Sequence, residues 1–563
     1  MSAEDIDVEK AVREPLTGKD TDGPAKVQFV TSTTGDGKNG EVNIVTATKP
    51  RRSGLSKEEL MKYANDPFWV RLRMIFFILF WIIWFGMLIG AIVIIIVVPK
   101  CPPSSKLKWY QKTSIYEVDV KSLADGVLGN FGYIGKLAME SIVLNSFYGN
   151  SFTELKSEVG SDSEFKSFVD KAGNKGKKVI LAFDFRYTIK NHTWLQKQFS
   201  GNSGFADYYL YTDNETVFSK NDQWTKHEES GKYYFAPLID GKIDRDFATL
   251  NFENKEVVEE VKNVIQFWKK ERKVNGFELL NADDLLPDSL FPNNTKRNVE
   301  IISKLRTHLY TKVDVSGKTG FFVDVSNRNE IAEFVGEPDS KIADLIVTDF
   351  FTAINANSKA KDVKKVMNDH YESLPKWPSA AGSRYGPWLG CRMSKRGKAI
   401  EETVGVDMVN SAYMMFYLMP NCTVMLTAGD ELSEEEKKTS GNSTYYDHYN
   451  STKVELVRKL GRIRRQHIDS ILMGSIKFPL EDDDVLTLVR FYPGLDGFLL
   501  IVNFANEDKT VKLDTNDYLP DKGSLILTSK EIEPEKQDIN LKEDISIGAK
   551  ESKLVQFTPL ITE

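Results

Sequence analysis

Cysteine is the residue type whose number and placement in this chain most directly suggest chemistry. The chain has three cysteines. Cys101 follows Pro99 and Lys100 at the end of a long apolar run, whereas Cys391 and Cys422 lie among apolar neighbours, as inert core thiols do. In an oxidising compartment an odd number of cysteines leaves one thiol for a bond to another chain. We therefore expect an intermolecular disulfide at Cys101; palmitoylation, the alternative for a membrane-proximal cysteine, belongs to the cytosolic side.

Other residue patterns give little support for metal or phosphate chemistry. The histidines are scattered without the spacing of metal ligands: His192, His227, His308, His370, His448 and His467. Asp283 and Asp284 are neighbours after an apolar run, where such a pair is expected to solvate a loop or to cap the next helix. The glycines at 35–40 follow no strand, so they do not predict a phosphate-binding loop. We expect neither a metal nor a cofactor.

One apolar run is much longer than any other in the chain. Residues 74–98 carry no charge, and a helix of this length spans roughly 37 Å, more than the roughly 30 Å hydrocarbon core of a bilayer. The run lies too far from the N-terminus for a cleaved signal peptide. Within it, Gly86, Gly90 and Ala91 would let another helix approach closely. We predict one transmembrane helix that lies in membrane lipid and contacts a partner at these small residues.

Changes in composition divide the chain into five segments. Residues 1–73 form a polar tail, most of which cannot bury enough apolar surface to fold and is predicted to be disordered. The membrane helix at 74–98 is followed by a stalk at 99–110. The remainder is long enough for a large domain at 111–475 and a small domain at 476–563. The net charge of −7, without a long basic block outside the membrane flank, argues against a nucleic-acid partner.

Charges and glycosylation acceptors together predict the orientation in the membrane. Four basic residues lie close to the helix on each side, so the positive-inside rule does not decide at that range. Arg51 and Arg52 add positive charge on the N-terminal side, and the Asn-x-Ser/Thr acceptors all follow the helix. Apart from Asn421, which lies in an apolar stretch, the predicted glycosylation sites are Asn191, Asn214, Asn293, Asn442 and Asn450. We predict a type II plasma-membrane protein with a cytosolic N-terminus and an extracellular C-terminal domain.

The large domain alternates short apolar strands with helical segments, as parallel β/α units do. The predicted strands are 114–120, 141–147, 178–185, 275–280, 320–325, 343–350 and 423–427. A further strand near 377–381 would complete a (β/α)8 barrel, whose active sites lie at the C-terminal ends of the strands. Three later apolar runs, with no helical pattern between them, predict an antiparallel β domain: 485–492, 498–504 and 524–527.

Several segments of the large domain resemble α-amylase-family glucosidases. Residues 207–209, 232–234 and 249–257, leading to Phe267-Trp268 and Gly276-Phe277, are similar to the stretch of those enzymes that ends in the nucleophile strand. Residues 178–184 resemble the third strand of the family, and residues 420–431 resemble the eighth. The resemblance covers most of residues 110–563 and implies a TIM barrel of the α-amylase type, with a reduced version of the glucosidase insertion at about 190–250.

The residues that would carry glycosidase chemistry are replaced. Retaining hydrolysis needs a nucleophilic carboxylate and an acid/base carboxyl about 5 Å apart. The family pattern Gly-Phe-Arg-x-Asp appears here with Glu278 at the arginine position and Leu280 at the nucleophile position. The fifth strand has no glutamate at its end, and only the shorter Asp324 is present. Thr188 and Ile189 replace an expected Asn-His pair. We therefore expect a protein that is not an enzyme.

A second resemblance covers the membrane segment. Residues 54–60, Pro67, Trp69-Val70-Arg71, the helix at 81–96 and Pro99-Lys100-Cys101 resemble the cytosolic approach, anchor and stalk of the heavy-chain subunits of heteromeric amino acid transporters, solute carrier family three. The resemblance implies that Cys101 corresponds to the cysteine that bonds a polytopic light chain. The expected function is to bind and stabilise such a light chain and to bring it to the plasma membrane.

Two other functions remain open from the sequence. One is a membrane-anchored α-glucosidase with a displaced set of carboxylates drawn from Asp184, Glu278 and Asp324. The other is an adhesion or signalling receptor whose outer domain binds other cell-surface proteins. A lone helix cannot enclose a polar pathway through lipid, so any transport route must belong to a partner chain.

Overall fold

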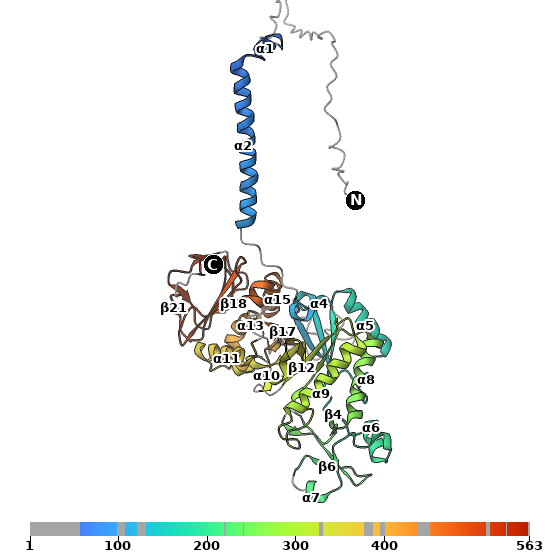
Figure 1. Ribbon diagram of the computed structural model, residues 1–563. Coiled ribbons are helices and arrows are strands. Elements are labelled where there is room, and N and C mark those ends of the chain that lie inside the picture. The colour runs from blue at the N-terminus through green and yellow to red at the C-terminus, as the bar shows by residue number, and fades with distance from the viewer. Residues whose placement is uncertain are drawn as a thin grey trace, which may run out of the picture. The chain divides into compact units, whose positions relative to one another are not determined.

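The computed structural model describes residues 57–97, 107–120, 131–218, 221–239, 241–325, 330–376, 387–394, 400–433, 435–436, 451–513, 518–535 and 537–560 (Figure 1). The chain divides into two compact units, residues 1–99 and residues 100–563. In the first unit, helix α1 spans Lys57–Tyr63 and helix α2 spans Pro67–Val97.

Helix α2 contains the predicted membrane helix and begins before it. Its segment Pro67–Ile94 is long and apolar enough to cross a membrane. The helix begins at a proline, which suits the first helical position because that position needs no N–H donor. The Asp66 carboxylate accepts a hydrogen bond from the Phe68 backbone N–H at 3.0 Å and so caps this end. The prediction of a single-pass membrane protein is confirmed, with a helix that starts seven residues earlier than the charge-free run.

The second unit contains a closed barrel of eight parallel strands in the order β1-β17-β16-β15-β12-β11-β3-β2. These strands are β1 Ile115–Asp119, β2 Ser141–Asn145, β3 Lys178–Phe183, β11 Gly276–Leu279, β12 Gly320–Asp324, β15 Leu345–Thr348, β16 Leu389–Arg392 and β17 Cys422–Thr427. Longer helices cover the outside of the barrel, among them α5 Asp162–Asn174, α8 Lys255–Arg272, α9 Thr295–His308, α11 Ala360–Ser373, α13 Val409–Tyr417 and α15 Thr452–Gln466. The predicted (β/α)8 fold is therefore confirmed.

One barrel strand lies at a different place from the prediction. The strand between β15 and β17 is β16, Leu389–Arg392, and not the predicted 377–381, which lies outside the described residues. A glycine and an arginine interrupt the apolar pattern of β16. A Cβ on Gly390 would lie 2.8 Å from the Met425 sulfur and 3.1 Å from a Val347 methyl, so close packing inside the barrel requires glycine there. The glycine and the arginine therefore weaken the hydrophobic signal of this strand in the sequence.

The insertion after β3 forms small antiparallel sheets rather than barrel strands (Figure 1). Its strands are β4 Tyr187–Ile189, β5 Tyr211–Thr212, β6 Trp224–Lys226, β7 Tyr233–Phe235, β8 Leu238–Ile239, β9 Lys242–Ile243 and β10 Phe247–Thr249. Strand β10 pairs with β4 and returns the chain to helix α8. The Asn254 side chain caps α8 by accepting a hydrogen bond from the Glu256 backbone N–H at 2.9 Å.

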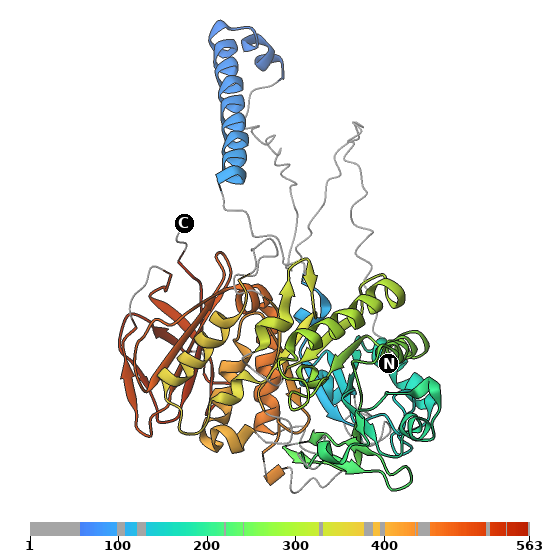
Figure 2. The same ribbon diagram turned by 60° about the horizontal axis from the view of Figure 1, so that its bottom comes forward.

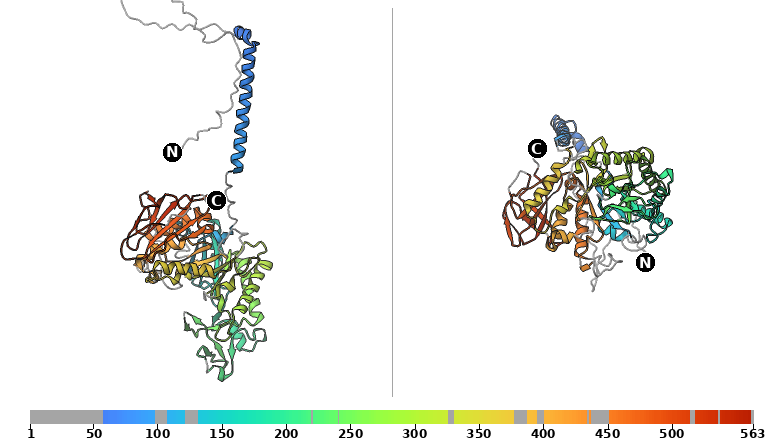
Figure 3. Two further views of the ribbon diagram at one scale, coloured as in Figure 1. Left: turned by 60° about the vertical axis from the view of Figure 1, so that its left-hand side comes forward. Right: turned by 90° about the horizontal axis from the view of Figure 1, so that it is seen from below.

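The chain ends in an antiparallel sheet of six strands in the order β18-β19-β20-β25-β22-β23. These are β18 Ser475–Lys477, β19 Val485–Phe491, β20 Gly497–Asn503, β22 Lys522–Thr528, β23 Asp538–Asn540 and β25 Ser552–Phe557. The insertion and this sheet lie on opposite sides of the barrel (Figure 2). Figure 3 shows the C-terminal sheet packed beside the barrel. Lys361 and Lys364 of α11 pair with Asp483 and Glu481, each at 3.0 Å, which joins the sheet to the barrel.

Candidate functional site

The interior of the barrel is apolar in its lower part and charged near the C-terminal ends of the strands. Ile115, Ile180, Phe322 and Leu345 belong to one buried cluster inside the ring of strands. Side chains two residues further along a strand face the same side. On this spacing, the next inward residue of β1 is Glu117, which is 1% exposed. The charged layer therefore lies where a TIM barrel would hold its active site.

A single arginine occupies the centre of this charged layer. The Arg392 guanidinium, at the end of β16, donates to both carboxylate oxygens of Glu117 at 2.8 Å. It also forms an ion pair with Asp324 at 3.0 Å and contacts the Glu278 carboxylate. These four side chains, which we call the Arg392 cluster, come from four different strands, and none is more than 9% exposed.

The charges of the Arg392 cluster stabilise one another. Burial alone lowers the pKa of Arg392, but the carboxylates of Asp324, Glu117 and Glu278 outweigh it and hold that pKa well above its ordinary value. A buried ion pair offsets its own desolvation only when its geometry is good and its hydrogen bonds are made. The two-pronged contact with Glu117 meets that condition. The cluster therefore acts as a structural cross-link between strands.

The position of the glycosidase nucleophile holds no reactive group. Leu280 follows β11 and packs against the apolar cluster inside the barrel. Asp324 is the carboxyl nearest to the expected acid/base position, and it forms an ion pair with Arg392. General acid catalysis needs a carboxyl that carries a proton at the right moment. A carboxylate paired with a guanidinium is poorly suited to that role.

The third carboxylate expected from the sequence, Asp184, is also fully engaged. Arg186 donates to both of its oxygens at 2.9 and 2.8 Å, and the Asn281 amide donates to one of them at 3.0 Å. Arg186 further pairs with Asp284 at 2.9 Å. Burial raises the pKa of Asp284, and the positive charge of Arg186 partly opposes the rise. Asp284 therefore pairs with Arg186, whereas the sequence predicted that it would solvate a loop or cap the next helix.

The acidic residues that follow β17, the eighth strand of the barrel, also form hydrogen bonds within the fold. The Glu431 carboxylate is fully buried and accepts hydrogen bonds from the Tyr116 hydroxyl at 2.5 Å and the Tyr133 hydroxyl at 2.8 Å. Burial raises the pKa of Glu431, although these hydrogen bonds oppose the rise. Asp430 accepts a hydrogen bond from the Ser394 hydroxyl at 2.7 Å. Both acidic residues hold loops in place.

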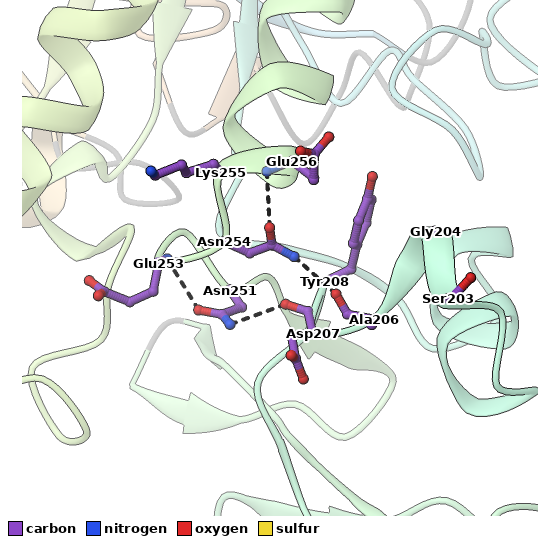
Figure 4. A pocket seen from close by; sticks show the side chains of 10 residues that line it. All are labelled: Ser203, Gly204, Ala206, Asp207, Tyr208, Asn251, Glu253, Asn254, Lys255 and Glu256. Carbon is purple, nitrogen blue, oxygen red and sulfur yellow. Dashed lines mark hydrogen bonds between the residues drawn. The ribbon is translucent and has the colours of Figure 1, made fainter.

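A surface hollow of about 710 Å3 lies beside the start of α8 and is shown in Figure 4. Asn251 donates to the Asp207 carbonyl at 3.1 Å and Asn254 donates to the Ala206 carbonyl at 3.0 Å (Figure 4). These two amides tie the insertion to the helix, so both side chains already have structural hydrogen bonds.

The small residues of α2 are not packed within the chain. A Cβ built on Gly86 or on Gly90 would meet no atom within 4 Å. Ala91 is exposed as well. Side chains elsewhere on α2 are large, and Trp81 forms aromatic contacts with Phe77 and Phe85. The face with Gly86 and Gly90 is therefore open to another helix.

The cysteines and glycosylation acceptors fall on both described and undescribed residues. Cys391 and Cys422 are free and fully buried on neighbouring strands, while Cys101 lies outside the described residues. Leu389 is the partner of Cys422 in the strand register, so the two buried cysteines are offset by two residues. Strand spacing and rise then separate their Cα atoms by about 8 Å, more than the roughly 7 Å limit for a disulfide.

Three predicted glycosylation sites lie on the surface. The exposed acceptors are Asn191, Asn214 and Asn293. Asn421 is 1% exposed, as expected for an acceptor in an apolar stretch. Asn442 and Asn450 lie outside the described residues, as does His448. Among the described residues, no group of three or more metal-ligating side chains gathers at one place.

Comparison with known proteins finds two family models that match different parts of the chain. Residues 41–116 match the family model of the N-terminus of solute carrier family 3 member 2, and residues 124–372 match the catalytic domain of α-amylase. The amino acid transporter heavy chain SLC3A2 of Mus musculus is 22% identical over 92% of this chain and 93% of its own length. The chain is therefore similar over most of its length to a solute carrier 3 heavy chain, and its barrel region is similar to the α-amylase catalytic domain.

Other similar proteins match over shorter stretches of this chain. The heavy chain SLC3A1 of Mus musculus is 26% identical over 70% of this chain and 63% of its own length. SLC3A2 of Oryctolagus cuniculus is 36% identical over 29% of this chain and 34% of its own length. These two matches thus span less than two thirds of each relative. Bacillus licheniformis trehalose-6-phosphate hydrolase has a TM-score of 0.64 at 16% identity, covering 80% of this chain and 100% of that chain, which shows the shared fold.

Sequence reasoning missed one residue of the charged layer near the C-terminal ends of the strands. Glu278 was recognised as a replacement at the arginine position of the family pattern, but its partner Arg392 was not. The available signal was an arginine within the otherwise apolar run 388–393. A positive charge in such a run requires a buried negative partner, and Glu278 and Glu117 each lie within a predicted strand.

Proposed function

We propose that this chain is the non-catalytic heavy chain of a heteromeric amino acid transporter. The observation that carries the proposal is a single membrane helix with an open small-residue face in a chain that is similar to a solute carrier 3 heavy chain. One helix cannot enclose a substrate pathway, so a polytopic light chain must supply it. The heavy chain binds and stabilises that light chain and accompanies it to the plasma membrane.

The link between the two chains is a disulfide at Cys101. Cys391 and Cys422 are buried and offset, which favours Cys101 as the thiol that is free for a partner. Replacing Cys101 by Ser should abolish a reducible high-mass band on non-reducing gels of membranes, whereas Ser104→Ala in the same stalk should leave it unchanged. A band that persists in Cys101→Ser would contradict the covalent link.

The second contact is helix packing at Gly86, Gly90 and Ala91. A Cβ on either glycine meets none of the described atoms within 4 Å, so Gly86→Leu and Gly90→Leu are expected to act through a partner. In the Cys101→Ser background, these variants should reduce co-purification of the light chain in mild detergent. Leu88→Phe is the matched control, since Leu88 lies about 200° around the helix from Gly86. Equal losses in all three variants would argue against this face.

Absence of glycosidase activity is a further part of the proposal. It is supported by Leu280 at the nucleophile position and by the ion pairs of Asp184 and Asp324 with arginines. Full-length protein should not hydrolyse maltose, and Leu280→Asp should not restore hydrolysis because the acid/base position remains paired. Maltose hydrolysis that is lost in Asp324→Asn would instead establish the alternative, a membrane-anchored α-glucosidase.

The outer domain is extracellular and glycosylated in this proposal. Asn191, Asn214 and Asn293 are exposed, which an acceptor must be. Enzymatic removal of N-glycans should increase the gel mobility of the cell-surface protein. Combined replacement of these three residues and of Asn442 and Asn450 by Gln should remove that shift, and a shift that survives would place the glycans elsewhere.

A further inference from the structure

The chain bends sharply just before the membrane helix. Helix α1 and helix α2 are separated by a short turn, in which the Asp66 N–H donates to the Tyr63 carbonyl at 3.2 Å. Helices usually end before a residue that precedes proline, which is the position of Asp66. The Arg73 guanidinium reaches back to the Ala64 carbonyl at 3.4 Å and braces the turn. Arg73 therefore has a role in holding α1 against the start of α2.

The side chains around this turn are suited to the headgroup layer of a membrane. Large apolar and aromatic side chains are exposed here: Met61 by 69%, Tyr63 by 52%, Phe68 by 63% and Trp69 by 44%. Trp and Tyr prefer the interface between lipid and water. Exposed Lys62 and Arg71 lie among them, and the charge-free part of the helix begins at residue 74. Apolar and basic groups thus alternate at the depth of the lipid headgroups.

The charge of the N-terminal tail is divided between its two parts. Residues 49–73 contain seven basic and three acidic residues, whereas residues 1–48 contain five basic and nine acidic residues. The excess of positive charge therefore lies within residues 49–73, with three of the seven basic residues at 49, 51 and 52. Clusters of this kind on the cytosolic side of a membrane helix attract anionic phospholipids. The alternative role of these basic residues is only to set the orientation of the helix in the membrane. That role needs a local excess of positive charge but predicts no preference among lipids.

We propose that the turn at residues 57–73, which holds four basic and three acidic residues, binds anionic phospholipid headgroups of the cytosolic leaflet, with Lys62 and Arg71 as the main contacts. This lipid-binding proposal rests on the proposed function, which places residues 57–73 on the cytosolic side of the membrane. The braced turn holds Lys62 and Arg71 beside apolar side chains that enter the interface, so the charges face the phosphates at little entropic cost. The acidic first part of the tail is repelled from the same surface and stays in the cytosol.

The test is lipid binding by full-length protein in detergent, titrated with phosphatidylserine or phosphatidylcholine and followed by native mass spectrometry. Wild type should bind phosphatidylserine more tightly than phosphatidylcholine. Lys62→Gln with Arg71→Gln should weaken phosphatidylserine binding by about thirtyfold, on the scale expected for two basic residues near an anionic surface. Arg73 is left unchanged because it braces the turn. Lys108→Gln with Lys112→Gln, beyond the membrane helix, is the matched control and should bind as wild type does.

Two results would overturn the proposal: equal binding of the two lipids by wild type, or an equal loss in the Lys108 and Lys112 control. The Cys101-dependent band is measured on the same samples. If wild type shows no lipid preference but keeps the Cys101-dependent band, the lipid-binding proposal is contradicted and the proposed pairing is not. An absent band in wild type contradicts the proposed pairing, whatever the lipid result.

Discussion

The barrel mouth, by which we mean the C-terminal ends of the strands around the Arg392 cluster, differs from the membrane helix in how its unusual residues are contacted. At the barrel mouth, Arg392 bonds to carboxylates from three other strands of the same chain. On the membrane helix, a Cβ on Gly86 or Gly90 would meet none of the described atoms within 4 Å. A site that is satisfied internally contributes stability, whereas a face that is left open is available to another molecule. The charged residues at the strand ends are therefore satisfied within the fold, whereas the small-residue face of α2 is left open.

The largest effect on folding is expected from breaking the Arg392 cluster. Arg392→Met would leave the buried Glu117, Glu278 and Asp324 carboxylates without their guanidinium, which should cost roughly 3–5 kcal/mol in the free energy of unfolding. Urea unfolding of the protein measures the change. Arg297→Met is the matched control, because the Arg297–Glu253 pair is half-exposed and should be worth less than about 1 kcal/mol. Similar losses in both variants would show that the cluster is not a special cross-link.

A smaller, pH-dependent effect is expected at the junction between insertion and barrel. His192 is 2% exposed, and its Nδ1 caps α6, Thr193–Phe199, by accepting from the Trp194 N–H at 3.2 Å. Burial lowers the pKa of His192 from 6.5 to about 4. Below pH 6.5 the unfolded chain binds a proton that the folded chain does not, so stability falls as the pH drops toward 4, by at most about 3 kcal/mol.

The control for this effect is His192→Asn, which keeps a side chain that can cap α6 but does not titrate. Unfolding free energies of the two proteins at pH 7 and pH 5 give the comparison. Wild type should lose more stability than His192→Asn over this interval. Parallel pH dependence in the two proteins would show that His192 is protonated equally in the folded and unfolded states.

The sequence predicted most of the barrel because its strands are apolar runs, but it could not predict what fills the barrel mouth. Seven strands follow from hydrophobic runs, and β16 was misplaced because Gly390 and Arg392 are there for packing and charge rather than for burial of apolar surface. The placement of Leu280 at the nucleophile position, inferred from the neighbouring motif, stays a prediction. The ion pairs of Arg392 depend on three strands that are far apart in the chain, and only the fold brings them together.

A still smaller effect is expected from the ion pairs between α11 and the C-terminal sheet. The pairs Lys361–Asp483 and Lys364–Glu481 are largely solvent-exposed, so Lys361→Ala with Lys364→Ala should cost at most about 1 kcal/mol in total. The loss should shrink further in 1 M salt, because salt screens exposed charges. Thermal unfolding at low and high salt measures both. A loss that is large and independent of salt would place these pairs with the Arg392 cluster.

The smallest effect on the folding of this chain is expected at the anchor, where the effect on pairing should be greatest. Gly90→Leu should leave the thermal unfolding of the barrel unchanged in detergent-solubilised protein without a partner, because a Cβ at this position meets no described atom within 4 Å. In contrast, Gly390→Leu in β16 should destabilise the barrel, since a Cβ there already approaches the Met425 sulfur to 2.8 Å. If Gly90→Leu unfolds the isolated chain as readily as Gly390→Leu, the membrane helix packs within the chain and its open face cannot be the partner site.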